Sequence, residues 1–300
     1  MATSQKYFDP RTLAKLRGLT LRARHIVEGY VAGFHRSPMR GFSIEFAEHR
    51  EYAPGDDLRH VDWKVFGRTD KFYVKQYEDE TNLLCYLVVD VSESMTYRSD
   101  PELLTKLEYA QTLAASLAWL ITQQSDAVGL VTFDREIRNI LRPSSSPSHL
   151  GQLLQVLEQN DPQEKTDTGR VFHELARRLT RRGVVAIFSD LFDDVEPLLS
   201  GLKHLRYRQH DVVLFHLFDP AELDFPFQQN TLFKGLEQFP EITTDPRAMR
   251  KAYLEEVHGY LEQIERQCRA FQIDHAIVRT TDSLDQVITT MIAKRSNVVN

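Results

Sequence analysis

Acid and hydroxyl side chains follow an apolar run in the stretch "LLCYLVVDVSESM" (83–95). The first half of this stretch is rich in β-branched and aromatic residues, which is typical of a buried strand. Asp90, Ser92 and Ser94 come where that strand should end. Their carboxylate and hydroxyl oxygens are the ligands that hard cations such as Mg²⁺ prefer in proteins. The stretch therefore predicts oxygen ligands for a metal ion at one strand end.

Two further segments supply oxygen ligands of the same kind. The apolar run "VVAIFSD" (184–190) ends in Asp190, and "KTDTGRVFHEL" places Thr166 and Thr168 just before a helix-like pattern. Because no Cys or His is among these residues, Mg²⁺ is the expected ion, and Mn²⁺ or Ca²⁺ would also fit. Two carboxylates and neutral hydroxyls would leave the ion with positive charge and an open position for a carboxylate of another molecule. The alternative interpretation is that the serines and threonines only cap helices.

Strand-like and helix-like patterns alternate from Leu83 to the end of the chain. The expected strands lie at 83–90, 127–134, 136–143, 184–190, 211–219 and 273–278, and the expected helices at 102–123, 150–157, 168–182, up to about 207, 250–271 and from 283 onward. This alternation predicts an α/β fold with an open, Rossmann-like, mostly parallel sheet that helices cover on both faces. Since functional groups gather at the carboxyl ends of parallel strands, three loops should bring the oxygen ligands to one edge.

The chain is expected to have two parts, residues 1–81 and 82–296. The first combines a basic, helix-like pattern at 11–34 with a β-rich segment in which "YAPGDD" has the composition of a turn. The second holds the alternating series, with an insertion rich in Phe and Pro at about 220–249.

Composition and motifs argue against several classes of function. A net charge of −6 gives no support for binding to nucleic acid or to a membrane surface. No secretion signal or membrane span is visible, and Cys85 and Cys268 fit core positions in a reducing compartment, so a cytoplasmic location is expected. The zinc motif H-E-x-x-H, the hydrolase motif G-x-S-x-G and the phosphate-binding loop are absent. His216 and His275, inside strand patterns, are expected to be core residues rather than ligands.

An enzyme remains the second hypothesis. The sequence "DVSES" is similar to the phosphatase pattern in which an aspartyl nucleophile is followed two residues later by a second Asp. Here Ser92 stands at that second position, so the general acid is missing. The preferred hypothesis is therefore a non-catalytic, metal-dependent protein-binding module, and the alternative is a metal-dependent phosphohydrolase that uses Asp90.

The D-x-S-x-S pattern, the later Thr and the Asp of "FSD" resemble the metal-ion-dependent adhesion site of von Willebrand factor type A domains. The resemblance covers about residues 83–295 and implies a six-stranded, mostly parallel sheet. It also implies that three hydroxyls touch the metal and that two carboxylates bind it directly or through water: Ser92, Ser94 and Thr166, and Asp90 and Asp190. Many such domains have Gly-Gly before the Thr, where this chain has Glu164-Lys165. Thr168 is therefore an alternative to Thr166, although the spacing to the following helix favours Thr166.

The segment at 40–80 carries a second resemblance. Its "REYAPGDDLRHVDW", followed by an Arg and by "VKQYEDE", is similar to the signature of the bacterial domain-of-unknown-function family 58. The resemblance implies an adaptor that acts with a MoxR-type AAA+ ATPase, or with the client of such an ATPase, in protein maturation or complex assembly. Many members carry transmembrane helices ahead of the signature, and this chain resembles a soluble member.

The signature segment also has physical features of its own. Acidic and basic residues are closely spaced around Trp63, which predicts an ion-pair network. We expect Trp63 to be largely buried, and Arg59 or Arg68 to pair with a carboxylate of the segment. The segment is then either a structural clasp against the second part of the chain or a recognition surface for a partner.

Overall fold

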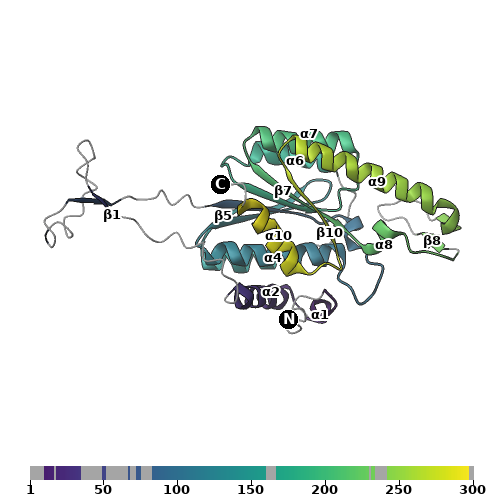
Figure 1. Cartoon of the computed structure of the whole chain (residues 1–300), viewed down its shortest axis with the longest axis horizontal. Helices are drawn as coiled ribbons and strands as arrows, with labels where there is room; N and C mark the ends of the chain where they lie inside the picture. The colour runs from purple at the N-terminus through teal and green to yellow at the C-terminus, as the bar shows by residue number, and fades with distance from the viewer. Residues whose placement is uncertain are drawn as a thin grey trace. The chain divides into compact units, whose positions relative to one another are not determined.

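Six strands form the main sheet (Figure 1). They are β3 (Leu84–Asp90), β4 (Ala127–Phe133), β5 (Ile137–Ser144), β6 (Val184–Ser189), β7 (Asp211–Phe218) and β10 (Asp274–Arg279). Their order is β10-β7-β6-β3-β4-β5, and all neighbours are parallel except β4 and β5. The predicted α/β fold with a mostly parallel sheet is therefore confirmed. The computed structural model describes residues 10–16, 18–34, 49–51, 67, 72–75, 83–159, 167–229, 231–233 and 242–296.

Helices cover both faces of this sheet, as expected. Figure 1 shows α6 (Thr168–Arg178), α7 (Val195–Tyr207) and α9 (Pro246–Ala270) on one face, and α4 (Lys106–Gln123) and α10 (Leu284–Ser296) on the other. The buried leucines of α5 (Pro147–Glu158) share the core of α4. Of the helices that the structure describes, none is both long enough and apolar enough to cross a membrane.

The side chains of the central strand β3 divide between two cores. Leu87 and Val89 pack with α4 and α5, whereas Tyr86 and Val88 pack with α6 and α7. All seven residues of β3 are buried, because helices cover both faces of the sheet. The last of them, Asp90, is consequently a charged residue in the interior of the protein.

Helix boundaries follow local capping. α4 begins at Lys106, later than the sequence indicated, because Thr105 and Glu108 form a capping box there. α9 begins at Pro246, earlier than expected, because Asp245 caps the helix and a proline is well suited to its first turn.

Helices α6 and α7 approach each other closely because two glycines lie in the contact. A Cβ added at Gly169 would lie 2.6 Å from the Cβ of Pro197, and one added at Gly201 would lie 2.7 Å from the Cβ of Phe172. Gly169 is the second residue of α6. The contact therefore fixes the start of the helix, where Thr168 lies.

The chain divides into two units: residues 1–33 with 83–300, and residues 34–82. The second unit contains an antiparallel pair, β1 (His49–Glu51) and β2 (Tyr73–Lys75), in keeping with the β-rich character expected of the segment. Trp63, Arg59 and Arg68 lie outside the described residues: their burial and pairing stay predictions.

The N-terminal helices α1 (Pro10–Ala14) and α2 (Leu19–Phe34) pack with the main sheet's core. Leu13 and Ile26 are fully buried there. Glu158, at the end of α5, accepts a hydrogen bond from the first backbone N–H of α2 (2.6 Å), where an acid favours the helix dipole. The sequence predicts a first part that spans residues 1–81, whereas the contacts of α1 and α2 join these helices to the alternating series.

Residues 220–249, expected to be an insertion, contain a short helix and a small sheet. α8 (Pro220–Asp224) precedes the antiparallel pair β8 (Thr231–Phe233) and β9 (Ile242–Thr244). Phe225, after α8, packs against Tyr253 of α9 with ring centroids 4.5 Å apart. Through this contact the segment packs against the long helix that follows it.

Candidate metal centre

Two buried acids end neighbouring strands at the carboxyl edge of the sheet. Asp90 is the last residue of β3, and Asp190 directly follows β6. The two strands pair in parallel near the middle of the sheet, with Val89 opposite Phe188. Asp90 is 0% exposed and Asp190 is 1% exposed. The structure thus brings together these two of the residues that the sequence proposed as ligands.

Both oxygens of the Asp90 carboxylate accept hydrogen bonds. Oδ1 accepts from the backbone N–H of Ser92 (2.9 Å), and Oδ2 accepts from the hydroxyl of Ser189 (2.5 Å). Burial, together with the nearby charge of Asp190, raises the pKa of Asp90 to about 7. The carboxylate is therefore held in a fixed orientation by neutral partners that balance none of its charge.

Ser92 and Ser94 lie beside this carboxylate. Both are buried, and their hydroxyl oxygens are 3.1 Å apart. Ser92 holds the N-cap position of a short 3₁₀ helix, η3 (Glu93–Thr96), yet its side chain makes no capping hydrogen bond. The interpretation of Ser92 as only a helix cap therefore fails, since a capping serine accepts a bond from a backbone N–H of the first turn.

A buried lysine balances the charge of the second acid. Lys106 is fully buried, and its ammonium donates to Asp190 Oδ2 (2.7 Å) and to Glu222 Oε1 (2.6 Å). Burial by itself would lower the pKa of Lys106, but the charges of the two carboxylates more than offset this effect and raise it above its usual value. Lys106 is consequently a permanent cation at the edge of the site.

Glu222 connects a third strand end to this lysine. It lies in α8, just after β7, and forms a capping box with Asp219. Asp219 also accepts a hydrogen bond from the backbone N–H of Ser99 (2.9 Å), in the loop after η3. Burial raises the pKa of Glu222 to about 7, against the opposing charge of Lys106 and with the added effect of Asp190. The loops after β3, β6 and β7 are thus joined through buried polar contacts.

Two threonines, Thr166 and Thr168, are candidates for the third hydroxyl ligand. Thr166 lies outside the described residues. Thr168 begins α6 and is buried, and both its backbone N–H and its hydroxyl donate to Asp193 Oδ2 at 2.7 Å. Asp167 is the residue that caps α6, by accepting a bond from the N–H of Arg170. The hydroxyl of Thr168 still has its lone pairs, and these could serve a cation only beside the bond to Asp193.

The donor set fits a hard cation and no other kind of metal. Within the described residues, no three His, Cys, Asp or Glu side chains are grouped so as to hold a metal ion. A cation at this edge would therefore depend on the hydroxyls of Ser92 and Ser94 in addition to Asp90 and Asp190. Such a mixture of carboxylate, hydroxyl and water oxygens is suited to Mg²⁺, Mn²⁺ or Ca²⁺.

His216 of β7 supports the backbone at Asp190. Its Nε2 lies 2.9 Å from the carbonyl oxygen of Asp190, and because a carbonyl can only accept, Nε2 carries the proton. Burial, with the neighbouring His275, lowers the pKa of His216 well below its usual value, so the ring is neutral. Nδ1 therefore accepts from Nε2 of His275 (3.2 Å). His216 is a hydrogen-bonded core residue, as the sequence predicted.

Lys106 and Glu222 were not predicted from the sequence. Lys106 has a detectable signal, because it shares a helical stripe with Ala110, Leu113 and Leu117, where an apolar residue is expected. Glu222 has no such signal, since it lies in the segment that the sequence predicts to be an insertion. Its role follows only from the tertiary contact with Lys106.

Comparison with protein families and curated proteins identifies relatives. A family model described as "Protein of unknown function DUF58" matches residues 48–260. Uncharacterized proteins of Mycobacterium bovis and Mycobacterium tuberculosis are 25% identical to this chain over 266 residues, which cover 87% of this chain and 82% of theirs.

Two solved structures are similar in part. One is the conserved hypothetical protein BatB from Bacteroides thetaiotaomicron, which is 16% identical, with a TM-score of 0.49 over 72% of this chain and 99% of that one. The other is an aerotolerance-related membrane protein from Bacteroides fragilis, 17% identical, with a TM-score of 0.47 over 71% of this chain and 99% of that one.

Proposed function

Because the chain belongs to the DUF58 family, whose function is unknown, we propose a role from the chemistry of its own residues. The protein is a non-catalytic, protein-binding adaptor that holds one divalent cation, Mg²⁺ by preference, at the carboxyl edge of its sheet. Two carboxylates and three hydroxyls surround the cation: Asp90, Asp190, Ser92, Ser94 and Thr166, with Thr168 as the alternative third hydroxyl.

The hydroxyl of Ser92 carries this proposal. It occupies a helix N-cap position without capping the helix, and instead lies 3.1 Å from the hydroxyl of Ser94. Both serines are buried next to Asp90, whose carboxylate is oriented by Ser189. Burying hydroxyls and an uncompensated carboxylate together costs free energy, which a bound cation would recover.

The distribution of charge supports an open coordination position. Asp190 is already paired with Lys106, and the hydroxyl ligands are neutral. A divalent ion would therefore keep positive charge and could accept a carboxylate of a partner protein. One such bond does not define a specific complex, so a surrounding contact surface of at least about 1,000 Å² is also needed.

The more specific assignments of the fold family and of the partner rest on resemblance to known protein families. The D-x-S-x-S pattern at the end of β3 and the mostly parallel sheet support a von Willebrand factor type A fold with its metal-ion-dependent adhesion site. The proposed partner, a MoxR-type AAA+ ATPase or its client, comes from the signature segment alone. The cytoplasmic location stays a prediction.

Calorimetric titration with Mg²⁺ and Mn²⁺ tests the metal site. Wild type should bind one ion, and Ser92→Ala/Ser94→Ala should bind it at least about tenfold more weakly, because two ligands are lost. Ser146 and Ser148 provide a matched control, since their hydroxyls form the same kind of i, i+2 pair (2.9 Å) at the exposed start of α5. Equal binding by wild type and Ser92→Ala/Ser94→Ala would refute the assignment.

A pull-down with a purified MoxR-type ATPase tests the adaptor role. Recovery should fall when EDTA is added and when Ser92 and Ser94 are replaced, but not when Ser146 and Ser148 are. Recovery that is indifferent to all of these changes would exclude a metal-bridged contact. Mg²⁺-dependent turnover of a generic phosphoester that is lost in Asp90→Asn would instead establish the phosphohydrolase.

A further inference from the structure

Arginines are grouped at the amino-terminal edge of the main sheet, opposite to the candidate metal centre. Helices α6 and α7 end at this edge, and strands β6 and β7 begin there. The arginines of these helix ends and of the turns that follow them are Arg177, Arg178, Arg181, Arg182, Arg206 and Arg208. Because the whole chain has a net charge of −6, the group is a local concentration of positive charge on an acidic protein.

Two of these arginines stabilise the fold itself. Arg178 forms an ion pair with Glu174, one turn earlier in α6 (2.5 Å). Arg206 donates to the carbonyl oxygens of Phe271 (3.0 Å) and His210 (2.7 Å), which joins the end of α7 to the segment before β10. The structure therefore accounts for Arg178 and Arg206 without any partner.

The other four arginines, which we call the arginine patch, have no such role. Their side chains are exposed, and among the residues that the structure describes they form no hydrogen bond or ion pair: Arg177, Arg181, Arg182 and Arg208. A basic residue in the last turn of a helix favours the helix dipole, which applies to Arg177. Arg181 and Arg182 lie beyond α6, so the dipole does not explain them.

The charges of two of these arginines act on one histidine ring. His204 of α7 contacts His173 of α6, with their Nδ1 atoms 3.0 Å apart. Partial burial lowers the pKa of His204, and the positive charges of its neighbour His173 and of Arg177 and Arg208 lower it further. Arg177 and Arg208, from the ends of two different helices, are therefore close to the same ring.

The turn at 179–183 brings Arg181 and Arg182 to the same place. His210, two residues after Arg208, is buried. Burial lowers the pKa of His210, backbone groups at both ends of the turn oppose this change, and the charge of Arg208 adds to it. The turn and Arg208 therefore both lie close to one buried ring, and the four arginines form a single patch.

The chemistry of the arginine patch favours the carboxylates of a short protein segment. Guanidinium groups bind carboxylates in a bidentate geometry. Tyr207, next to Arg208, is 85% exposed, and tyrosine and arginine are enriched where protein interfaces bind most strongly. A nucleic acid or a membrane surface would extend beyond the patch and meet the negative charge of the rest of the protein. A short acidic segment meets the arginines alone.

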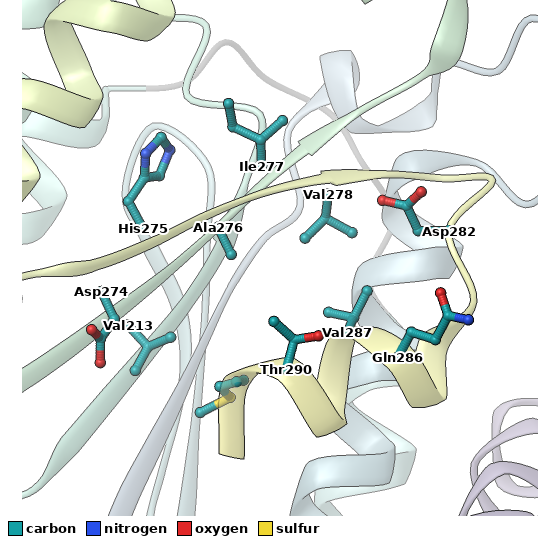
Figure 2. A pocket seen from close by; sticks show the side chains of 11 residues that line it. Val213, Asp274, His275, Ala276, Ile277, Val278, Asp282, Gln286, Val287 and Thr290 are labelled. Atoms are coloured by element: carbon teal, nitrogen blue, oxygen red, sulfur yellow. The ribbon is translucent and has the colours of Figure 1, made fainter. Parts of the chain in front are cut away.

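The pocket between β10 and α10 gives an anion no comparable place (Figure 2). It has a volume of about 300 Å³, and none of its lining residues is a Lys or Arg. Figure 2 shows Asp282 and Gln286 together at one end of it. Since the lining contains no cationic side chain, we assign the anion to the arginine patch and not to this pocket.

We propose that the arginine patch binds a short segment of a partner protein that is rich in Asp or Glu. The guanidinium groups pair with the carboxylates of the segment, and Tyr207 adds contact area. This contact goes beyond the proposed metal-dependent one, because the patch and the metal centre lie at opposite edges of the sheet. It should therefore persist in EDTA.

Two labelled synthetic peptides test the proposal on the full chain. Both have a central run between Gly-Ser ends, and the run consists of four glutamates in one peptide and four glutamines in the other. At low ionic strength the glutamate peptide should bind at least about tenfold more tightly, since several exposed charge pairs add together. Its affinity should fall as NaCl is added, because salt screens exposed charges. Fluorescence anisotropy in EDTA measures the affinities.

Two double variants separate the patch from the net charge. Arg181→Gln/Arg182→Gln should weaken the binding of the glutamate peptide roughly fivefold, the effect of losing two exposed charge pairs. Arg247→Gln/Lys251→Gln removes the same charge at exposed positions near the start of α9. This control variant should bind the peptide as wild type does.

The pKa of His204 provides a second readout at the patch itself. The bound glutamate peptide should raise it, because carboxylates oppose the charges of Arg177 and Arg208. Arg177→Gln/Arg208→Gln should raise it without any peptide, and the peptide should then add little. A pH titration followed by NMR of the histidine rings measures these changes.

Three results would overturn the proposal. The first is that the wild type binds neither peptide, or binds both equally. The second is that the patch variant Arg181→Gln/Arg182→Gln and the control variant lose the same affinity, since only net charge would then matter. The third is that a single-stranded oligonucleotide, or vesicles containing phosphatidylserine, bind more tightly than the glutamate peptide and lose affinity in the patch variant. The patch would then serve a nucleic acid or a membrane surface.

Discussion

Two buried polar clusters meet at the carboxyl edge of the sheet, and they differ in whether their acids have a cationic partner. In the lysine cluster (Lys106, Asp190 and Glu222), the ammonium lies within 2.7 Å of both acids. In the aspartate cluster (Asp90, Ser92, Ser94 and Ser189), the acid has only hydroxyl and backbone N–H partners, and burial raises its pKa to about 7. We expect the cluster whose acids share a cationic partner to stabilise the fold, and the acid that has only neutral partners to be the one that a bound cation would stabilise.

Replacing Lys106, the ammonium of the lysine cluster, should have the largest effect on stability. Lys106→Met keeps most of the side-chain volume but leaves two buried carboxylates without a positive partner. We expect a loss of about 3–5 kcal/mol in the free energy of unfolding, measured by urea denaturation. The loss should be greater at pH 8 than at pH 5, because Glu222, whose pKa is about 7 even with Lys106 present, can take up a proton at the lower pH.

An exposed lysine provides the control for this variant. The side chain of Lys251 is 89% exposed and forms an ion pair with Glu255 at 3.8 Å. Lys251→Met should change the stability by less than about 0.5 kcal/mol. If Lys106→Met were as harmless as Lys251→Met at pH 8, the lysine cluster would not be the stabilising one.

Neutralising Asp90 should change the stability in the opposite direction, that is, raise it. The folded-state pKa of Asp90, about 7, lies above the usual value of 3.8. In the absence of divalent ions the contribution of Asp90 to the stability is therefore greatest below about pH 4 and is lost as the pH rises through 7. Asp90→Asn removes this loss, and should be more stable than wild type by about 2 kcal/mol at pH 8 in EDTA. Thermal melts should also show that Mg²⁺ no longer raises its melting temperature.

Asp134 is the matched acid for this comparison. It is also fully buried, but it has a cationic partner, Arg138, at 2.7 Å. Asp134→Asn should therefore lower the stability at pH 8, whereas Asp90→Asn raises it. A change of stability in the same direction for both variants would remove the distinction between acids with and without a cationic partner.

The smallest expected effect is the difference in stability change between variants of two N-cap residues. Thr105 caps α4 through its side chain, whereas Ser92 makes no such bond at η3. In EDTA, Thr105→Ala should lose about 1 kcal/mol of stability, and Ser92→Ala should lose less than half of that. Only Ser92→Ala should reduce the stabilisation by Mg²⁺. The reverse order would mean that Ser92 serves the helix after all.

The sequence predicts the aspartate cluster better than the lysine cluster. Asp90, Ser92 and Ser94 adjoin one apolar run, and the rule that functional groups lie at strand ends places Asp190 near them. The bond between Lys106 and Glu222 joins residues 116 positions apart, so no local pattern contains it. Apolar periodicity also gives the order of the elements, but not which loops meet through buried charges.

The parallel sheet also imposes an order of events during synthesis on the ribosome. β3 and its neighbour β4 are made early, but β6, on the other side of β3, follows much later, since Ser189 comes 99 residues after Asp90. Because a chain emerges from its N-terminal end, β3 has an unpaired apolar edge until that segment appears. Such an edge can pair with the wrong strand. The nascent protein therefore passes through an interval in which its central strand needs protection, and that interval ends only when β6 closes the sheet over it.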